Sequence, residues 1–173
     1  MLQNWMVFAS MGVGFLGIIV AILLYVFIQK QDRGPENIRD IASSIHGGAM
    51  AFLKKEYSYL FFFVLFVFIL LLFFIASKTA VAFLVGALFS TLAGFVGMKA
   101  ATSANVRTAQ AANSSGQSKA LIVAFSGGAV MGLIVAGLGL LGVSAFYYFY
   151  YSQGSLVDLQ SIAGFAMGAS SIA

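Results

Sequence analysis

The sequence predicts an all-α protein: a polytopic transmembrane helical bundle with four complete spans and the start of a fifth. Hydrophobic residues make up 61% of its 173 residues, whereas charged residues make up only 8%. A soluble domain carries about a quarter of its residues as Asp, Glu, Lys and Arg. This composition therefore excludes a water-soluble enzyme and a nucleic-acid-binding domain. The chain has no cysteine, which excludes disulfides and thiolate metal sites.

The first span is expected over residues 5–28, because no charged residue precedes Lys30. At about 1.5 Å per residue this stretch forms roughly 36 Å of helix, enough to cross a hydrocarbon core of about 30 Å. A cleaved signal peptide would begin with basic residues, and the first four residues contain none. Gly12, Gly14 and Gly17 match the dinucleotide-binding pattern G-x-G-x-x-G, but inside an apolar span they indicate close helix packing.

The connection 29–56 predicts an amphipathic helix that merges into the second span. Pro35 suits the first position of a helix, and Glu36 favours the positive N-terminal end of the helix dipole. One histidine without cysteine or acidic neighbours does not build a metal site, so His46 is expected to be structural or exposed. Apolar residues recur at three- and four-residue steps and give one apolar face: Ile38, Ile41, Ile45, Ala49 and Phe52.

The second and third spans are expected over residues 57–76 and 80–98. The second is bulky on all sides and suits a lipid-facing position. The segment 99–119 that follows is rich in small and polar residues and contains no acid. This segment has two interpretations. The favoured one is a helix extension packed on a neighbouring helix. The other makes Arg107 an anion contact near a phosphate-bearing substrate. The candidate cytoplasmic contacts are Asn105, Arg107 and Thr108.

The fourth span is expected over residues 120–146, and a fifth begins over residues 161–173. Gly128 and Gly132 form a G-x-x-x-G step, which predicts tight packing of the fourth span inside a bundle. The fifth stretch reaches only about 20 Å at 1.5 Å per residue, which is too short to cross, so the last helix is expected to be cut off within the membrane.

Basic residues predict the orientation. The first connection contains five and the third contains three, against one in the second and none in the fourth. Lysine and arginine collect on the cytoplasmic side. The segments 29–56 and 99–119 are therefore expected in the cytoplasm and the N-terminus outside. No ionisable residue lies centrally in the four spans, so no ion pathway is indicated in them. No residue is assigned as an ion gate or as a catalytic, metal or substrate-binding group.

Four stretches together resemble membrane-integral, ion-pumping inorganic pyrophosphatases. They are GAMAFLKKEY at 48–57 with the isoleucines before it, the small-residue pattern around Asn105, Arg107 and Thr108 within 97–116, AFSGGAVMG at 124–132, and GASSIA at 168–173. The resemblance covers roughly residues 38–173 in order and at matching spacings. Several multi-residue matches in order are more specific than any single motif.

The resemblance implies a homodimer with helices in two concentric rings, in an inner cell membrane or an equivalent energy-coupling membrane. Such pumps hydrolyse pyrophosphate with Mg²⁺ and move H⁺ or Na⁺ outward; the resemblance leaves the ion and activation by K⁺ open. Residues 1–173 would be the N-terminal part of one integral membrane domain. Because the family's acidic catalytic loops have no counterpart here, the chain alone is expected to be inactive. The alternative is a small, complete, glycine-rich oligomeric membrane scaffold or pore without enzymatic activity.

Overall fold

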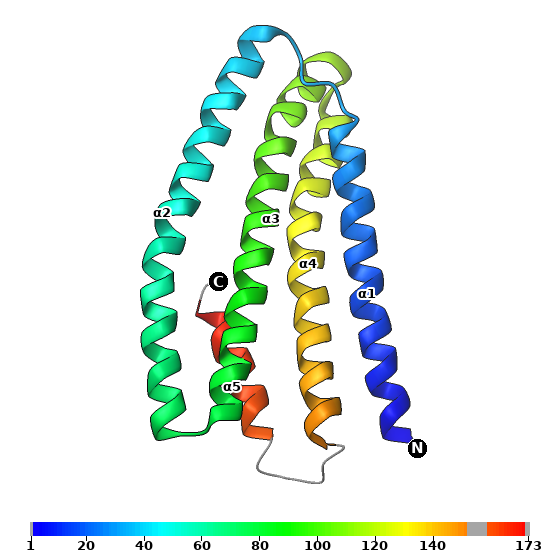
Figure 1. Cartoon of the computed structure of the whole chain (residues 1–173). Helices are drawn as coiled ribbons and strands as arrows, with labels where there is room; N and C mark the ends of the chain where they lie inside the picture. Colours follow the sequence, from blue (N-terminus) through cyan, green and yellow to red (C-terminus); the bar gives the residue numbers. More distant parts are fainter. Residues whose placement is uncertain (1, 152–158, 172–173) are drawn as a thin grey trace.

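The computed structural model describes residues 2–151 and 159–171, and the described residues form helices and short connections without a strand. Four helices are long and apolar enough to cross a membrane, and a fifth is short. This confirms the predicted all-α membrane bundle. The helices, labelled in Figure 1, are α1 Leu2–Gln29, α2 Glu36–Phe74, α3 Ser77–Ser115, α4 Gln117–Tyr151 and α5 Leu159–Ser170.

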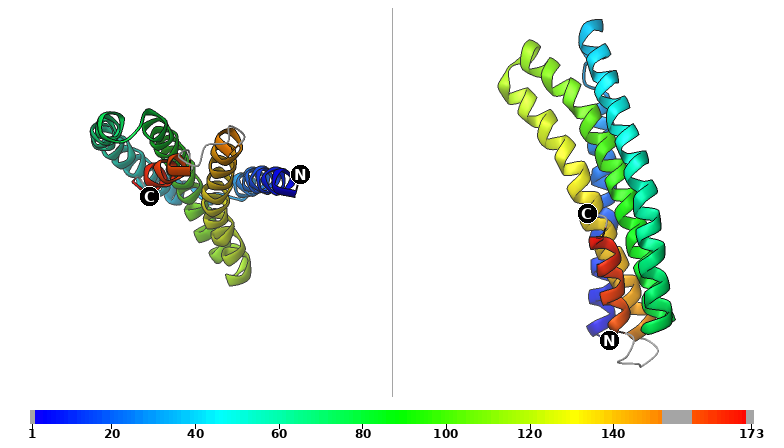
Figure 2. Two further views of the ribbon diagram at one scale, coloured as in Figure 1. Left: turned by 90° about the horizontal axis from the view of Figure 1, so that it is seen from below. Right: turned by 90° about the vertical axis from the view of Figure 1, so that its left-hand side faces the viewer.

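The four long helices run up and down, side by side in the order α2, α3, α4, α1 (Figure 1). The connections α1–α2 and α3–α4 lie at one end of the bundle, and the α2–α3 connection lies at the other. Helix α3 is central, because it packs against α2, α4 and α5 and also touches α1. Seen from below in Figure 2, α5 lies beside α3 and α4.

Helices α2 and α3 extend well beyond a bilayer. Each has 39 residues, or about 58 Å of helix at 1.5 Å per residue, against a hydrocarbon core of about 30 Å. The segment 29–56 does merge into the second span, and the segment 99–119 continues α3 as far as Ser115. Both predicted helix extensions are therefore confirmed, and the two project from the same end of the bundle.

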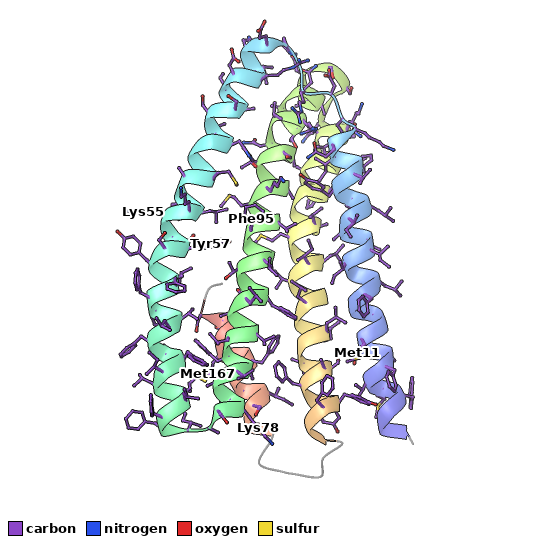
Figure 3. All side chains as sticks on the ribbon, viewed as in Figure 1. Met11, Lys55, Tyr57, Lys78, Phe95 and Met167 are labelled. Atoms are coloured by element: carbon purple, nitrogen blue, oxygen red, sulfur yellow. The ribbon has the colours of Figure 1, made fainter. Side chains whose placement is uncertain are left out.

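The predicted apolar face of α2 is mostly exposed and does not pack on α3. Ile41 and Phe52 are 63% and 58% exposed, whereas Leu53 is buried. The side that meets α3 is partly polar: His46 bonds to Thr102, and the Tyr57 hydroxyl donates to the Thr91 carbonyl oxygen. Figure 3 shows Tyr57 on the α3 side of α2 and many bulky side chains projecting from its other side. The periodicity of apolar residues identified one face of α2 but not what that face contacts. Apolar side chains in a membrane protein are as favourable against lipid as against another helix.

Close backbone approach between α1 and α4 depends on two glycines. A Cβ atom on Gly14 would lie 2.9 Å from the carbonyl oxygen of Gly137, and one on Gly137 would lie 2.8 Å from that of Gly14. The helix-packing interpretation of the first-span glycines therefore holds for Gly14. No described atom lies within 4 Å of a Cβ on Gly128 or Gly132, so the packing of this step inside a larger bundle stays a prediction.

Helix α5 packs on α3 through a second glycine pair. A Cβ on Gly164 would lie 2.6 Å from the carbonyl oxygen of Thr79, and one on Gly168 would collide with that of Phe83. These glycines are four residues apart and form the small-xxx-small step that lets membrane helices approach closely. Beside them Phe165 is buried and its ring stacks against those of Phe89 and Phe146, which fixes the rotation of α5.

Candidate functional site

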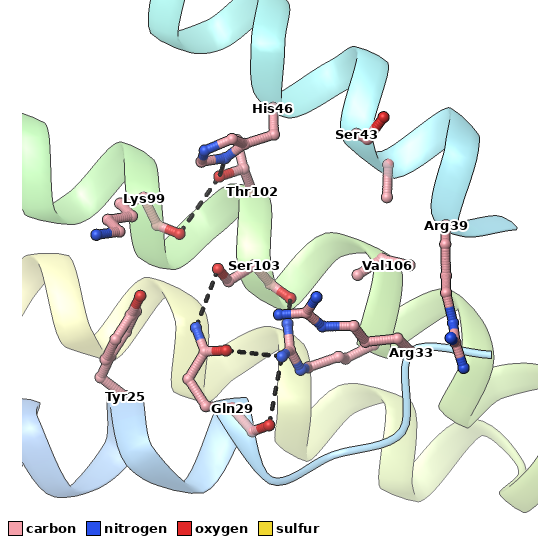
Figure 4. A pocket seen from close by; sticks show the side chains of 12 residues that line it. Tyr25, Gln29, Arg33, Arg39, Ser43, His46, Lys99, Thr102, Ser103 and Val106 are labelled. Atoms are coloured by element: carbon pink, nitrogen blue, oxygen red, sulfur yellow. Dashed lines mark hydrogen bonds between the residues drawn. The ribbon is translucent and has the colours of Figure 1, made fainter. Parts of the chain in front are cut away.

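A cavity of about 440 Å³ opens where α1 ends and α2 begins, against the far part of α3 (Figure 4). Its lining is polar and basic. Helix α1 contributes Tyr25 and Gln29, and the α1–α2 connection contributes Arg33. Helices α2 and α3 each contribute one face to the lining. The charged or titratable side chains on these two faces are Arg39, His46, Lys99 and Arg107.

Helix periodicity explains why α2 and α3 present polar faces to this cavity. Lys99, Ser103 and Arg107 are spaced by four residues and therefore lie on one side of α3. Arg39 and Ser43 are spaced in the same way on α2. Of these basic residues, Arg107 was a candidate contact, whereas Lys99 and Arg39 were counted for orientation only. The four-residue spacing on each helix was the signal that would have indicated a common surface.

Arg107 is buried at the centre of this region, with 2% of its surface exposed. Its Nε donates to the Gln31 carbonyl oxygen (3.2 Å), and its Nη1 donates to that of Ser103 (2.7 Å). Its Nη2 donates to the carbonyl oxygen (3.3 Å) and the side-chain Oε1 (2.7 Å) of Gln29. Helix α1 ends at Gln29, where carbonyl groups lack intrahelical partners and carry partial negative charge. Arg107 thus caps α1 from α3.

The α1–α2 connection is tied down on both sides. The Gly34 amide donates to Asp32 Oδ1 (3.0 Å), and Gln110 on α3 donates to Asp32 Oδ2 (3.1 Å). These bonds, the first above all, lower the pKa of the Asp32 carboxyl. Arg39 Nε donates to the Gly34 carbonyl oxygen (2.7 Å), and Gly34 has a φ of 76°, which suits glycine. The connection is therefore held in one shape, with Arg33 and Arg39 at the cavity.

His46 is half-buried and takes part in a bond between α2 and α3. Its Nδ1 lies 2.9 Å from the Thr102 hydroxyl oxygen, and that hydroxyl donates to the Met98 carbonyl oxygen at 2.9 Å. The hydroxyl hydrogen is thereby used, which makes Nδ1 the donor to Thr102. This is the structural role anticipated for the single histidine.

The three candidate contacts are not gathered in one place. Asn105 and Thr108 line a different cavity of about 370 Å³, between α3 and α4, whereas Arg107 lines the first. Residues three apart share a helix face, and a residue between them points elsewhere. The Thr108 hydroxyl oxygen is buried and has no hydrogen-bond partner among the described residues.

The described residues do not fit a magnesium site. Across residues 2–151 and 159–171, no group of three or more His, Cys, Asp or Glu side chains lies close enough to hold a metal ion. The lining of the first cavity includes four cations and no carboxylate. Mg²⁺ binds through carboxylates, water and phosphate oxygens, so a cavity lined by cations and without a carboxylate does not suit this metal.

Comparison with known proteins gives consistent matches. The family model described as "Inorganic H+ pyrophosphatase" matches residues 15–173. The chain is 46% identical over 172 residues, 99% of its length, to the "Putative K(+)-stimulated pyrophosphate-energized sodium pump" of Clostridium tetani. It is 43% identical over 162 residues, 92% of its length, to the "K(+)-insensitive pyrophosphate-energized proton pump 2" of Moorella thermoacetica. Each match covers 24% of the relative, so the chain spans about a quarter of the length of these proteins.

Proposed function

Because this chain belongs to the inorganic H⁺ pyrophosphatase family, we propose that it forms the N-terminal membrane scaffold of a pump that couples pyrophosphate hydrolysis to cation transport. The observation that carries the proposal is the family match over residues 15–173, on a bundle with four helices long enough to cross a membrane. The alternative of a glycine-rich pore is not favoured, since the relatives are named as pumps.

Within such a pump, this chain would supply structure rather than chemistry. Arg107 uses four hydrogen bonds to join the end of α1 to α3, which supports a structural contact. Asn105 and Thr108 lie on the opposite side of α3 and are proposed as contacts there with further helices. No hydrolytic step is assigned to these residues, because Mg²⁺, which the family implies, finds no suitable ligand group among the described ones. A homodimeric assembly is part of the same proposal.

A chimera tests this function. This chain would replace the matched segment of the C. tetani pump or of the M. thermoacetica pump, and each chimera would be reconstituted in liposomes. We expect pyrophosphate- and Mg²⁺-dependent uptake of Na⁺ in the first and of H⁺ in the second, since this chain contains no central ionisable residue to select the ion. The measurements are ion uptake and phosphate release.

The chain reconstituted by itself is the control for the chimeras, and it is expected to release no phosphate above the empty-liposome background. A chimera that folds as well as its parent pump but neither hydrolyses pyrophosphate nor moves ions would contradict the proposed scaffold. Mg²⁺-dependent turnover by the chain alone would contradict the division between scaffold and chemistry.

The proposed orientation places the N-terminus outside and the α1–α2 and α3–α4 connections in the cytoplasm. Ser114 and Ala76 lie exposed at opposite ends of the bundle, and the chain has no native cysteine. We expect Ser114→Cys to react with a membrane-impermeant maleimide only from the cytoplasmic side, and Ala76→Cys only from outside. Labelling of both from one side would rule out this topology. A cysteine at Gly154, in the connection that follows α4, is also expected to react only from outside; Gly154 lies outside the described residues.

A further inference from the structure

The basic cavity contains positive charge without negative charge opposite it. Asp32, Glu36, Asp40 and Glu56 are the carboxylates at this end of the molecule, and none of them lines it. Among the described residues, no salt bridge joins its basic side chains to an acid. Arg39 lies close enough to Asp32 to lower the pKa of that carboxyl, but the side chain of Asp32 does not line the cavity. The cations come from the α1–α2 connection, from α2 and from α3: Arg33, Arg39, Lys99 and Arg107.

A general excess of basic residues on one side of the membrane does not explain this arrangement. That excess predicts how many cations lie at this end, but not that they converge on one cavity. Lys30, Lys54 and Lys119 are exposed at the same end and do not line it. Arg33 also lies close enough to act on buried Arg107 as a like charge, which is unfavourable unless an anion offsets it.

Several donors in the cavity have no partner in the part of the chain that the structure describes. No hydrogen bond joins the Arg33 guanidinium, the Lys99 ammonium or the Tyr25 hydroxyl to a described residue. Arg39 uses only its Nε, in the bond to Gly34. Arg107, in contrast, is committed to carbonyl groups and the Gln29 side chain. The available donors thus come from three separate segments that meet at one cavity.

We propose that this cavity binds the phosphate group of an anion, supplied by an anionic lipid headgroup or by free phosphate. Guanidinium and ammonium groups form strong, charge-assisted hydrogen bonds with phosphate oxygens. The cavity holds about 440 Å³, against about 30 Å³ for one water molecule in the liquid. It lies at the end of the apolar part of α1, beside Tyr25, at the level where basic pockets between membrane helices meet headgroups. Since no carboxylate lines it, the anion binds without Mg²⁺.

The test uses the whole chain, purified in a mild uncharged detergent. Its probes are phosphatidylglycerol, with phosphatidylcholine as the neutral comparison, and inorganic phosphate. Native mass spectrometry measures retained lipid, and the shift in melting temperature measures phosphate binding. The cavity variant is Arg33→Gln/Lys99→Gln. Its matched control, Lys30→Gln/Lys54→Gln, loses the same two charges at exposed positions outside the cavity.

We expect affinity for one probe to fall about ten-fold or more in the cavity variant and to stay within about two-fold in the control. Each basic group that contacts the phosphate contributes about 1 kcal/mol, or about five-fold in affinity, and the cavity variant removes two of them. Loss confined to phosphatidylglycerol identifies a lipid headgroup, and loss of the phosphate-induced shift identifies free phosphate. Equal weakening in both variants, or no binding of either probe to the unchanged chain, would overturn the proposal. Should the cavity variant fail to fold, Arg39→Gln at an exposed lining position replaces it under the same criteria.

Discussion

Arg107→Met is expected to lower the free energy of unfolding of the bundle by at least about 3 kcal/mol, because hydrogen bonds to a charged group are each worth about 1.5–3 kcal/mol. Methionine retains much of the apolar length of arginine but provides no donor. The variant leaves the carbonyl oxygens of Gln29 and Gln31 without the donor that caps α1. Thermal unfolding in detergent, followed by circular dichroism, measures the loss.

Two variants define how Arg107 acts. Lys119→Met removes an exposed positive charge at the start of α4 and should change stability by less than about 0.5 kcal/mol. Arg107→Lys should recover little, because a single ammonium does not reproduce the planar fork that reaches Gln29, Gln31 and Ser103 together. If Arg107→Met were as stable as Lys119→Met without any added anion, the capping role would be excluded.

Gly168→Leu is expected to separate α5 from α3. Even the first side-chain carbon would collide with the Phe83 carbonyl oxygen and lie 2.9 Å from the Ala87 amide nitrogen, and both are backbone atoms of a continuous helix. Backbone cannot rotate aside as a side chain does, so the helices must move apart. Overpacking typically costs about 1–3 kcal/mol, and the middle of that range, about 2 kcal/mol, corresponds to about a thirty-fold increase in the population of the separated state.

A buried reporter measures this separation. Ser161 on α5 is 2% exposed, and Ser161→Cys would introduce a single thiol into a chain without cysteine. We expect this thiol to react with a small maleimide at least about ten times faster when Gly168→Leu is present, as for an opening of that free energy. Gly132→Leu is the matched control, since a Cβ there meets no described atom within 4 Å. Equal reactivity in the two backgrounds would contradict the glycine-mediated contact.

The sequence predicted the helices better than their contacts. Backbone that crosses lipid must satisfy its own hydrogen bonds, so a long apolar run in a membrane protein forms a helix. The runs that begin near Trp5 and Leu60 both lie in helices long enough to span a membrane. Ile41 belongs to the predicted apolar face and is exposed, because a helix face described by periodicity carries no information about its neighbour. The contact of Gly168 was not predicted, because small-residue steps occur on several helices and only the fold selects which of them meet. The Gly132 step meets no described atom, and its packing in a larger bundle stays a prediction.

The candidate site was predicted only in part. Arg107 was singled out by its position in a segment without acids, and the structure places it at the end of α1. Arg33, Arg39 and Lys99 were counted but not grouped, because their convergence depends on how the α1–α2 connection folds back toward α3. That path is set by the bonds of Asp32 and Gly34, which are local contacts that hydropathy does not reveal.

The unbroken length of α3 gives it the properties of a rigid lever. It runs from Ser77 to Ser115 without proline, the residue that most often kinks a helix. Arg107 at the basic cavity and Phe83 at the α5 contact therefore belong to one stiff rod, about 36 Å apart at 1.5 Å per residue. A displacement of its Arg107 end is transmitted to α5 as a tilt of the whole rod, because Gly164 and Gly168 bring the backbone of α5 directly against that of α3 at Thr79 and Phe83.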